Sequence, residues 1–205
     1  MRGFCTNMEY FELFDINGTP IGRTKERNAV HRDGDLHGGA HVWILGDRHA
    51  DGSVDVLFQK RSENKDSFPG CYDISSAGHV SAGETFPLAA VRELKEELNI
   101  DAAESDLFFL HRQLVDDSHI FHGKRFVNKE VNFVYALSGS VPLDSIKIQE
   151  SEISSLRWEN SNDTLKRLRE GDPSYCVMLS EFEKLLTLTE GRDFLLHKNA
   201  RKLWH

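Results

Sequence analysis

Residues Gly78 to Ile100, with the sequence GHVSAGETFPLAAVRELKEELNI, decide the fold expected of this chain. Apolar residues recur at helical spacing from Thr85 to Leu98. Thr85 is a residue type that caps helix N-termini, and a proline such as Pro87 is tolerated in a first turn. The stretch therefore predicts a helix over Thr85 to Leu98, entered through a glycine-containing loop.

The predicted helix has an apolar face and an acidic face. The apolar face, which we expect to be buried, carries Leu88, Val91, Leu94 and Leu98. The opposite face carries Glu93, Glu96 and Glu97. Like charges at this spacing destabilise an exposed helix by roughly 0.2–0.5 kcal/mol per pair. Either this face is a solvated acidic surface, or its charge is offset by Arg92 and a hard divalent cation with oxygen ligands.

Composition narrows the class of protein. The chain has 205 residues, of which 39% are apolar and 28% charged, a balance typical of a globular domain. Its net charge of −8 argues against a nucleic-acid binder, and a small anionic substrate would need a cation beside it. No apolar run is long enough to span a membrane. The three cysteines, Cys5, Cys71 and Cys176, are widely spaced, which favours reduced thiols and a cytoplasmic location.

Strand-like runs flank the predicted helix. Tyr10 to Thr24 predicts a hairpin that turns at Asn17-Gly18, whereas the Gly, Pro and Ser content of Phe68 to Val80 predicts mostly irregular chain. Further strands are expected over His41 to Leu45, Val54 to Gln59, Leu107 to Val115 and Val131 to Leu137. Closing helices are expected over Asp163 to Arg169 and Met178 to Leu188. These elements predict an α/β sandwich around a mixed sheet. We expect one domain over 1–205, with an N-terminal hairpin extension at 10–30 and a C-terminal helical segment at 160–205.

The spacing of the acidic helix resembles the signature of a known family. Five residues separate Gly78 from Glu84, and seven more precede the run Arg92-Glu93-Leu94-Lys95-Glu96-Glu97-Leu98-Asn99-Ile100. This pattern resembles the Nudix box. It departs from the box at one defined position, where this chain has Asn99 and the family has glycine. The resemblance implies a Nudix-type α/β/α sandwich and a hydrolase that cleaves a diphosphate linkage in a small nucleotide-like or other organic molecule.

The resemblance also implies a role for each residue of the box. Glu93 and Glu97 would be the main ligands of Mg²⁺, with Mn²⁺ as a possible substitute. Glu96 would be a further ligand or would activate water, and Gly78 would offer its carbonyl. Glu84 would support the site, and Arg92 would hold Glu93 in place through a charge-assisted hydrogen bond.

Similarity outside the box points to one branch of this family. The segments HRDGDLHGGAHVW (31–43) and FPGCYDISSAGH (68–79) resemble proteins related to isopentenyl-diphosphate isomerase. That isomerase requires a proton-relaying cysteine two residues before the position of His79, where this chain has Ala77. Cys71 is six residues too early to replace it. Two alternatives to a hydrolase are an isomerase, opposed by Ala77, and an inactive binding module, which would be expected to have lost glutamates that are all present here.

Other candidate residues lie outside the acidic helix. The resemblance to the isomerases suggests a second divalent-metal site at His31, His37 and His79; the alternative is that these histidines hydrogen-bond within their loops or contact phosphate. Glu130, just ahead of a predicted strand, is a candidate general base or extra ligand, or else part of a surface ion pair. Candidates for binding substrate phosphate are Arg61, Lys65 and Arg112, with Lys124 and Arg125 as further possibilities. The organic group of the substrate and the oligomeric state are left open by the sequence.

Overall fold

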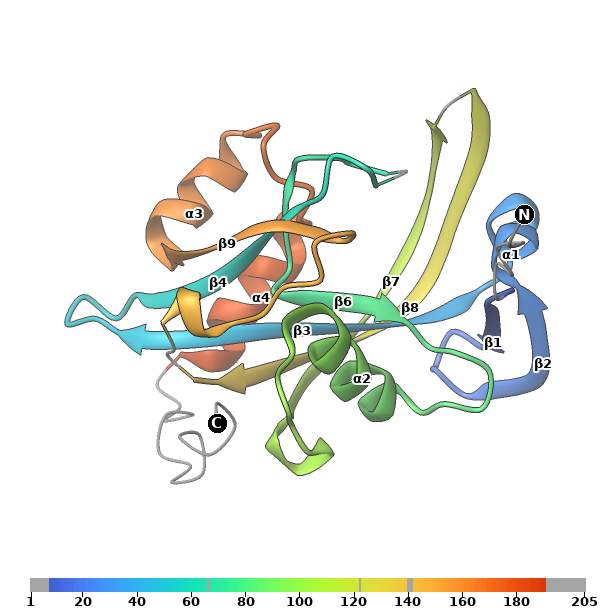
Figure 1. Ribbon diagram of the computed structural model, residues 1–205, viewed down its shortest axis with the longest axis horizontal. Helices are drawn as coiled ribbons and strands as arrows, with labels where there is room; N and C mark the ends of the chain where they lie inside the picture. The colour runs from blue at the N-terminus through green and yellow to red at the C-terminus, as the bar shows by residue number, and fades with distance from the viewer. Residues whose placement is uncertain (1–7, 66, 122, 140–141, 191–205) are drawn as a thin grey trace, which may run out of the picture.

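Strand β3 (His37–Arg48) is the central strand of a mixed sheet in the computed structural model, which describes residues 8–65, 67–121, 123–139 and 142–190 (Figure 1). It runs parallel to β8 (Lys124–Ser138) and antiparallel to both β4 (Val54–Arg61) and β6 (Ser76–His79). The sheet extends through pairs with β5 (Tyr72–Asp73), β7 (Phe108–Phe121) and β9 (Ile153–Asn160). The hairpin of β1 (Tyr10–Phe14) and β2 (Pro20–Glu26) joins β3 at its N-terminal end.

Helices cover the sheet on both faces (Figure 1). Helix α2 (Phe86–Leu98) packs on one face over a core that includes Val42, Ile44 and Tyr135. Helices α3 (Ser161–Arg169) and α4 (Leu179–Thr189) pack on the other, over a core that includes Trp43, Phe58 and Phe182. Helix α1 (Arg27–Asp33) contacts the N-terminal half of β8, and short 3₁₀ helices span Glu104–Asp106 and Leu143–Ser145. The predicted α/β sandwich around a mixed sheet is confirmed.

The elements expected from local patterns are largely present. The hairpin turns between Phe14 and Pro20, where the Asp15 side chain accepts from the backbone of Asn17 and Thr19. Both closing helices form close to their predicted positions. The expectation of irregular chain over Phe68 to Val80 was wrong in part, because β5 and β6 lie within it. Helix α1 and strand β9 were not predicted. Residues 191–205 of the expected C-terminal segment lie outside the described residues. No described helix is both long and apolar enough to cross a bilayer.

Helix α2 begins and ends where its sequence predicts. The Thr85 hydroxyl accepts a hydrogen bond from the N–H of Leu88 at 3.4 Å, and the helix starts at Phe86, directly after Thr85. At the other end Asn99 adopts a left-handed conformation, with φ 55° and ψ 32°. Its N–H donates to the carbonyl of Lys95 at 3.0 Å. Asparagine thus performs the C-capping role for which glycine is the commonest residue.

The buried face of α2 differs from the prediction. Phe86, Ala89 and Ala90 pack against the sheet together with Leu94 and Leu98, whereas Leu88 is 43% exposed and Val91 is only partly buried. The two small alanines permit close approach to the sheet, so the helix is rotated toward them. This rotation brings Glu97 into the interior, where it is 7% exposed. The prediction that Glu97 lies opposite the buried face was therefore wrong, and the alternative of a solvated acidic surface does not hold for it.

Candidate active site

The site begins where α2 lies against β6. A Cβ atom at Gly78 would lie 2.0 Å from the carboxyl carbon of Glu93, a separation that no side chain tolerates. The absence of a side chain at Gly78 therefore creates the space in which the Glu93 carboxylate sits. This explains in physical terms why a glycine in β6 is needed opposite a glutamate on α2.

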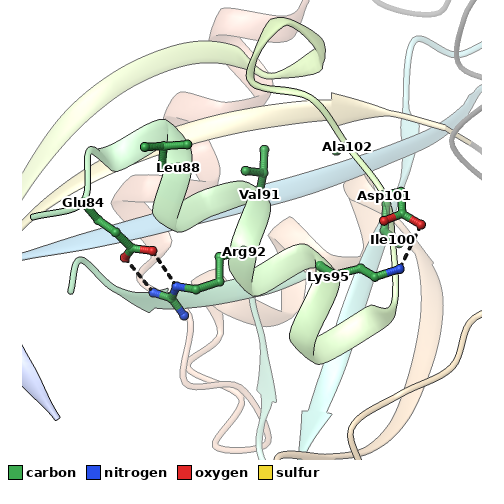
Figure 2. Close-up of a pocket in the computed structure, with 8 residues that line it drawn as sticks. All are labelled: Glu84, Leu88, Val91, Arg92, Lys95, Ile100, Asp101 and Ala102. Carbon is green, nitrogen blue, oxygen red and sulfur yellow. Dashed lines mark hydrogen bonds and ion pairs between the residues drawn. The ribbon is translucent and has the colours of Figure 1, made fainter.

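Arg92 joins the loop, the helix and the strand. It pairs with Glu84 through two contacts, Nε to Oε1 at 2.8 Å and Nη2 to Oε2 at 3.1 Å, and Figure 2 shows the two side chains facing each other. Its Nη1 donates to Glu93 at 2.7 Å and to Glu96 at 3.2 Å. Its Nη2 also donates to the carbonyl of His79 at 2.9 Å. Arg92 therefore fixes the orientation of the acidic side chains around it.

The backbone at the outer edge of β6 also faces these carboxylates. In the described residues β6 pairs with β3 alone, and Gly78 lies opposite Ala40 while Val80 donates to Gly38. The polar groups of Gly78 therefore point toward β3, because backbone direction alternates along a strand. Those of Ala77 point the other way, and its N–H donates to Glu97 at 3.3 Å. This corrects the prediction for the Gly78 carbonyl: the carbonyl on the carboxylate side belongs to Ala77.

Two of the three glutamates are held in an environment that disfavours their charge. Burial raises the pKa of Glu93 to about 6, although Arg92 acts in the opposite direction. Burial, reinforced by the charge of Glu93, raises the pKa of Glu97 to about 8. Glu96 is more exposed. All three line one cavity of about 1690 Å³. Neighbouring carboxylates whose charge is disfavoured in this way fit a hard divalent cation, which would neutralise them.

The three predicted histidines converge beside the same cavity, which His31 and His79 line. Ligand atoms of His31, His37 and His79 lie within 4.8 Å of one another. Nδ1 of His31 contacts the carbonyl of Val127 at 3.4 Å, and Nδ1 of His37 contacts that of Asp35 at 3.0 Å. With Nδ1 as the donor, Nε2 of a neutral ring is left as an acceptor. Neither Nε2 atom has a hydrogen-bond partner among the described residues, although both are buried.

The charge states of the histidines and of the neighbouring Glu130 suit this cluster to binding a cation. Burial lowers the pKa of His31 to about 3, and burial also lowers the pKa of His79, so both rings are neutral at physiological pH. Oε1 of Glu130 lies 3.3 Å from Nε2 of His79 and 3.6 Å from Nε2 of His37. Burial alone would raise the pKa of Glu130, but contact with the Nε2 atoms of His37 and His79, which carry a proton when no cation is bound, holds it well below its usual range. Glu130 is thus a buried partner of the histidines rather than part of a surface ion pair.

The basic residues predicted to bind phosphate are distributed unevenly. Arg61 lines the cavity but is held by Asp73 at 2.8 Å and by the carbonyl of Ser67. Lys65 also lines it and is paired with Glu152. Arg112 lies opposite Phe133, on the α2 face of the sheet, and donates to Asn17 at 3.2 Å, so it is not brought to the cavity. The side chains of Lys124 and Arg125 lie outside the described residues.

Some cavity residues were not predicted. His41 and Asn132 line the cavity from β3 and β8, and Glu181 reaches it from α4. His41 and His37 are both odd-numbered residues of β3 and therefore share a face. Alternation along the segment HGGAH was the signal that could have indicated His41. Glu181 carried no such signal, because only tertiary packing brings α4 to the sheet.

Comparison with known proteins agrees with this geometry. Residues 35–178 match the family model described as the NUDIX domain, a stretch that includes α2, β6 and most of the cavity. The chain belongs to the Nudix family. Its relatives include Nudix hydrolase 3 of Arabidopsis thaliana, 35% identical over 95% of this chain. An uncharacterised Nudix hydrolase of Clostridium acetobutylicum is 34% identical over 72% of this chain. The chain spans 26% of the Arabidopsis protein and 68% of the Clostridium protein.

The predicted branch of the Nudix family is also confirmed. The isopentenyl-diphosphate isomerase of Pectobacterium atrosepticum is 28% identical over 76% of this chain and 79% of its own length. Among solved structures, a Deinococcus radiodurans protein superposes with a TM-score of 0.62, covering 86% of this chain and 98% of its own at 19% identity. At that identity the likeness establishes the Nudix fold. The relatives named as hydrolases support the predicted class of pyrophosphohydrolase.

Proposed function

We propose that this Nudix protein hydrolyses the diphosphate linkage of a small nucleotide-like or other organic diphosphate, with Mg²⁺ or Mn²⁺ held by the carboxylates of α2. The observation that carries the proposal is that buried Glu97 and partly buried Glu93 lie together beside the outer edge of β6 with raised pKa values. Arg92 pairs with Glu93 but not with Glu97, so two neighbouring carboxylates with raised pKa values share too little positive charge, and a cation would supply it.

The donors present fit such a cation. Glu93 and Glu97 would supply carboxylate oxygens, Ala77 its backbone carbonyl, and Glu96 a further oxygen from the more exposed end. All are hard oxygen donors, the kind that Mg²⁺ prefers. When bound, the cation withdraws charge from the diphosphate oxygens and lowers the pKa of bound water.

The chain's own residues then orient the reaction. Arg92 holds Glu93 and Glu96 in place while its remaining contacts fix it to Glu84 and His79. Glu96, the most exposed of the three glutamates, would accept the proton of an attacking water if it is not itself a ligand. Arg61 and Lys65 line the cavity and would contact substrate phosphates, provided that their present carboxylate partners release them.

A second cation site is proposed at the histidine cluster. The unpartnered Nε2 atoms of His31 and His37 support it, because backbone carbonyls at Nδ1 fix the tautomer that a metal requires. Glu130 would then act as an additional ligand rather than as the general base. Elemental analysis of purified protein tests this: His37→Ala should lose bound metal, while His49→Ala, which alters an exposed histidine, should not.

The hydrolase proposal is tested by a screen of substrates. Nucleoside di- and triphosphates, nucleotide sugars, dinucleotide cofactors and isoprenoid diphosphates are incubated with Mg²⁺ or with EDTA, and released phosphate or monophosphate is measured. Turnover of at least one compound with Mg²⁺ and none with EDTA is expected. Failure to hydrolyse any diphosphate with Mg²⁺ or Mn²⁺ would contradict the proposal.

A further inference from the structure

The floor of the cavity is one face of the central sheet. Along β3 this face carries His37, Gly39 and His41, and along β8 it carries Glu130, Asn132 and Val134 in direct register. His37 belongs to the histidine cluster at one end of the cavity. His41 lies four residues along the strand, about 13 Å away at the usual rise per residue. The floor between them is therefore separate from the histidine cluster.

His41 is held in a fixed orientation by a buried carboxylate. Its Nδ1 lies 3.0 Å from Oε2 and 3.1 Å from Oε1 of Glu181, a residue of α4 that is 1% exposed. Nε1 of Trp43 donates to the same carboxylate at 2.9 Å. Burial alone would lower the pKa of His41, but the charge and hydrogen bond of Glu181 raise it to about 9. His41 lines the cavity, and its Nε2 makes no hydrogen bond to any residue that the structure describes.

Asn132 adds an acceptor to the same floor. Its Nδ2 donates to Glu130 at 3.1 Å, which leaves Oδ1 buried and without a hydrogen-bond partner in the described part of the chain. A Cβ at Gly39 would lie 2.0 Å from this Oδ1 atom, so the glycine makes room for it. The oxygen therefore lies over Gly39, two residues along β3 from His41.

The position of His41 relates this floor to the carboxylates. His41 lies directly opposite Ala77 of β6, and the N–H of Ala77 donates to Glu97. Side chains directly opposite each other project on the same face. Glu93, Glu97, His41 and Asn132 line the same cavity, so the organic group of a diphosphate bound at the two glutamates can reach His41 and Asn132. A hydrocarbon group there would bury an N–H donor and a carbonyl acceptor without partners, which is unfavourable.

We propose that His41, oriented by Glu181, and Asn132 form a hydrogen-bonding subsite that selects substrates whose organic group carries both an acceptor and a donor, as nucleosides do, against isoprenoid chains. The subsite rests on the proposed hydrolase function, because it binds the group attached to the diphosphate. His41 donates through Nε2 and Asn132 accepts through Oδ1. His41 is thus a residue that determines specificity.

Kinetics with paired substrates test the subsite. kcat and KM are measured with Mg²⁺ for ADP, GDP, CDP and UDP and for isopentenyl diphosphate, using the full chain. The wild type should prefer at least one nucleoside diphosphate. His41→Leu should lower kcat/KM for that compound at least tenfold, mainly through KM, and should keep or raise the value for isopentenyl diphosphate, because leucine has no N–H donor to leave unpaired. Glu181→Gln keeps acceptor and donor groups at the same place but removes the charge. It should therefore lower kcat/KM for the preferred nucleoside diphosphate by less than His41→Leu does.

A control variant and two contrary outcomes distinguish a role of His41 and Glu181 in substrate selection from a role in packing α4 alone. His49→Leu removes an exposed histidine paired with Asp55, and it should leave the selectivity unchanged. Equal losses for both classes of substrate in His41→Leu and Glu181→Gln would show that the pair only anchors α4, which overturns the subsite. A wild-type protein that hydrolyses nucleoside and isoprenoid diphosphates equally well would also overturn the subsite. If the wild type hydrolyses none of these compounds, the hydrolase proposal fails for them, and calorimetric binding of the same compounds to wild type and Glu181→Gln still decides the subsite.

Discussion

The carboxyl group of Glu93 occupies the space that a side chain at Gly78 would need. A Cβ at Gly78 would be 2.0 Å from both Cδ and Oε1 of Glu93. We expect Gly78→Ala to displace the carboxylate and lower kcat at least a hundredfold, with a loss of stability of about 1–3 kcal/mol from overpacking. Turnover and thermal melts check this. Near-normal turnover of Gly78→Ala would show that the position of Glu93 is not needed.

Removing the charge of Glu97 tests the cation site directly. Glu97→Gln preserves the volume of a 7%-exposed side chain but weakens its ability to bind a cation. We expect kcat to fall at least a hundredfold, equivalent to about 2.7 kcal/mol of transition-state stabilisation. Lys95→Gln is the matched control on the same helix, because Lys95 is exposed and pairs with Asp101 (Figure 2). A folded Glu97→Gln protein with normal turnover would refute the assignment.

The raised pKa of Glu97 predicts how stability depends on pH when metal is removed. The pKa is about 8 in the folded state against 4.5 for an ordinary glutamate, so the folded state holds the proton more tightly. This contribution is fully present below about pH 4.5 and is lost as the pH rises to about 8. Across that window the free energy of unfolding of EDTA-treated wild type should fall relative to Glu97→Gln by on the order of a few kcal/mol. Parallel profiles in denaturant titrations would contradict the prediction.

The left-handed conformation of Asn99 predicts the effect of two substitutions. Asn99→Gly relieves the strain of φ 55° but adds entropy to the unfolded chain, a term of roughly 0.4–1 kcal/mol. The two effects nearly cancel, so stability should change by less than about 1 kcal/mol. Asn99→Val should be worse by about 1–2 kcal/mol, because a β-branched residue is strained there. Thermal melts of both variants decide this, and equal stability would mean that the cap is unimportant.

Ala77 leads us to expect that this protein does not isomerise isopentenyl diphosphate. It lines the cavity at the position where the isomerases need a proton-relaying cysteine, and its methyl group transfers no proton. Cys176 also lines the cavity, but its thiol donates to the carbonyl of Tyr72 and burial raises its pKa strongly. We therefore expect no dimethylallyl diphosphate from isopentenyl diphosphate. Formation of that isomer above background in an NMR assay would favour the isomerase alternative.

The sequence by itself determined the features that depend on neighbouring residues. The start of α2 follows from Thr85 and its end from Asn99, because capping uses atoms within one turn of the chain. The resemblance of this stretch to the Nudix box predicted the hydrogen bond from Arg92 to Glu93, which joins adjacent residues of one helix and is present at 2.7 Å. The turn at Asn17-Gly18 was equally local.

The tertiary structure decided which faces of these elements meet. The rotation of α2 that exposes Leu88 and buries Glu97 depends on how Ala89 and Ala90 pack against the sheet. Strand β6 forms in a segment rich in turn residues because β3 supplies its hydrogen-bond partners. The same pairing places His41 beside Ala77, and α4 brings Glu181 to His41 across 140 residues of sequence. Such contacts arise from pairing and packing between distant segments, which local residue patterns do not encode.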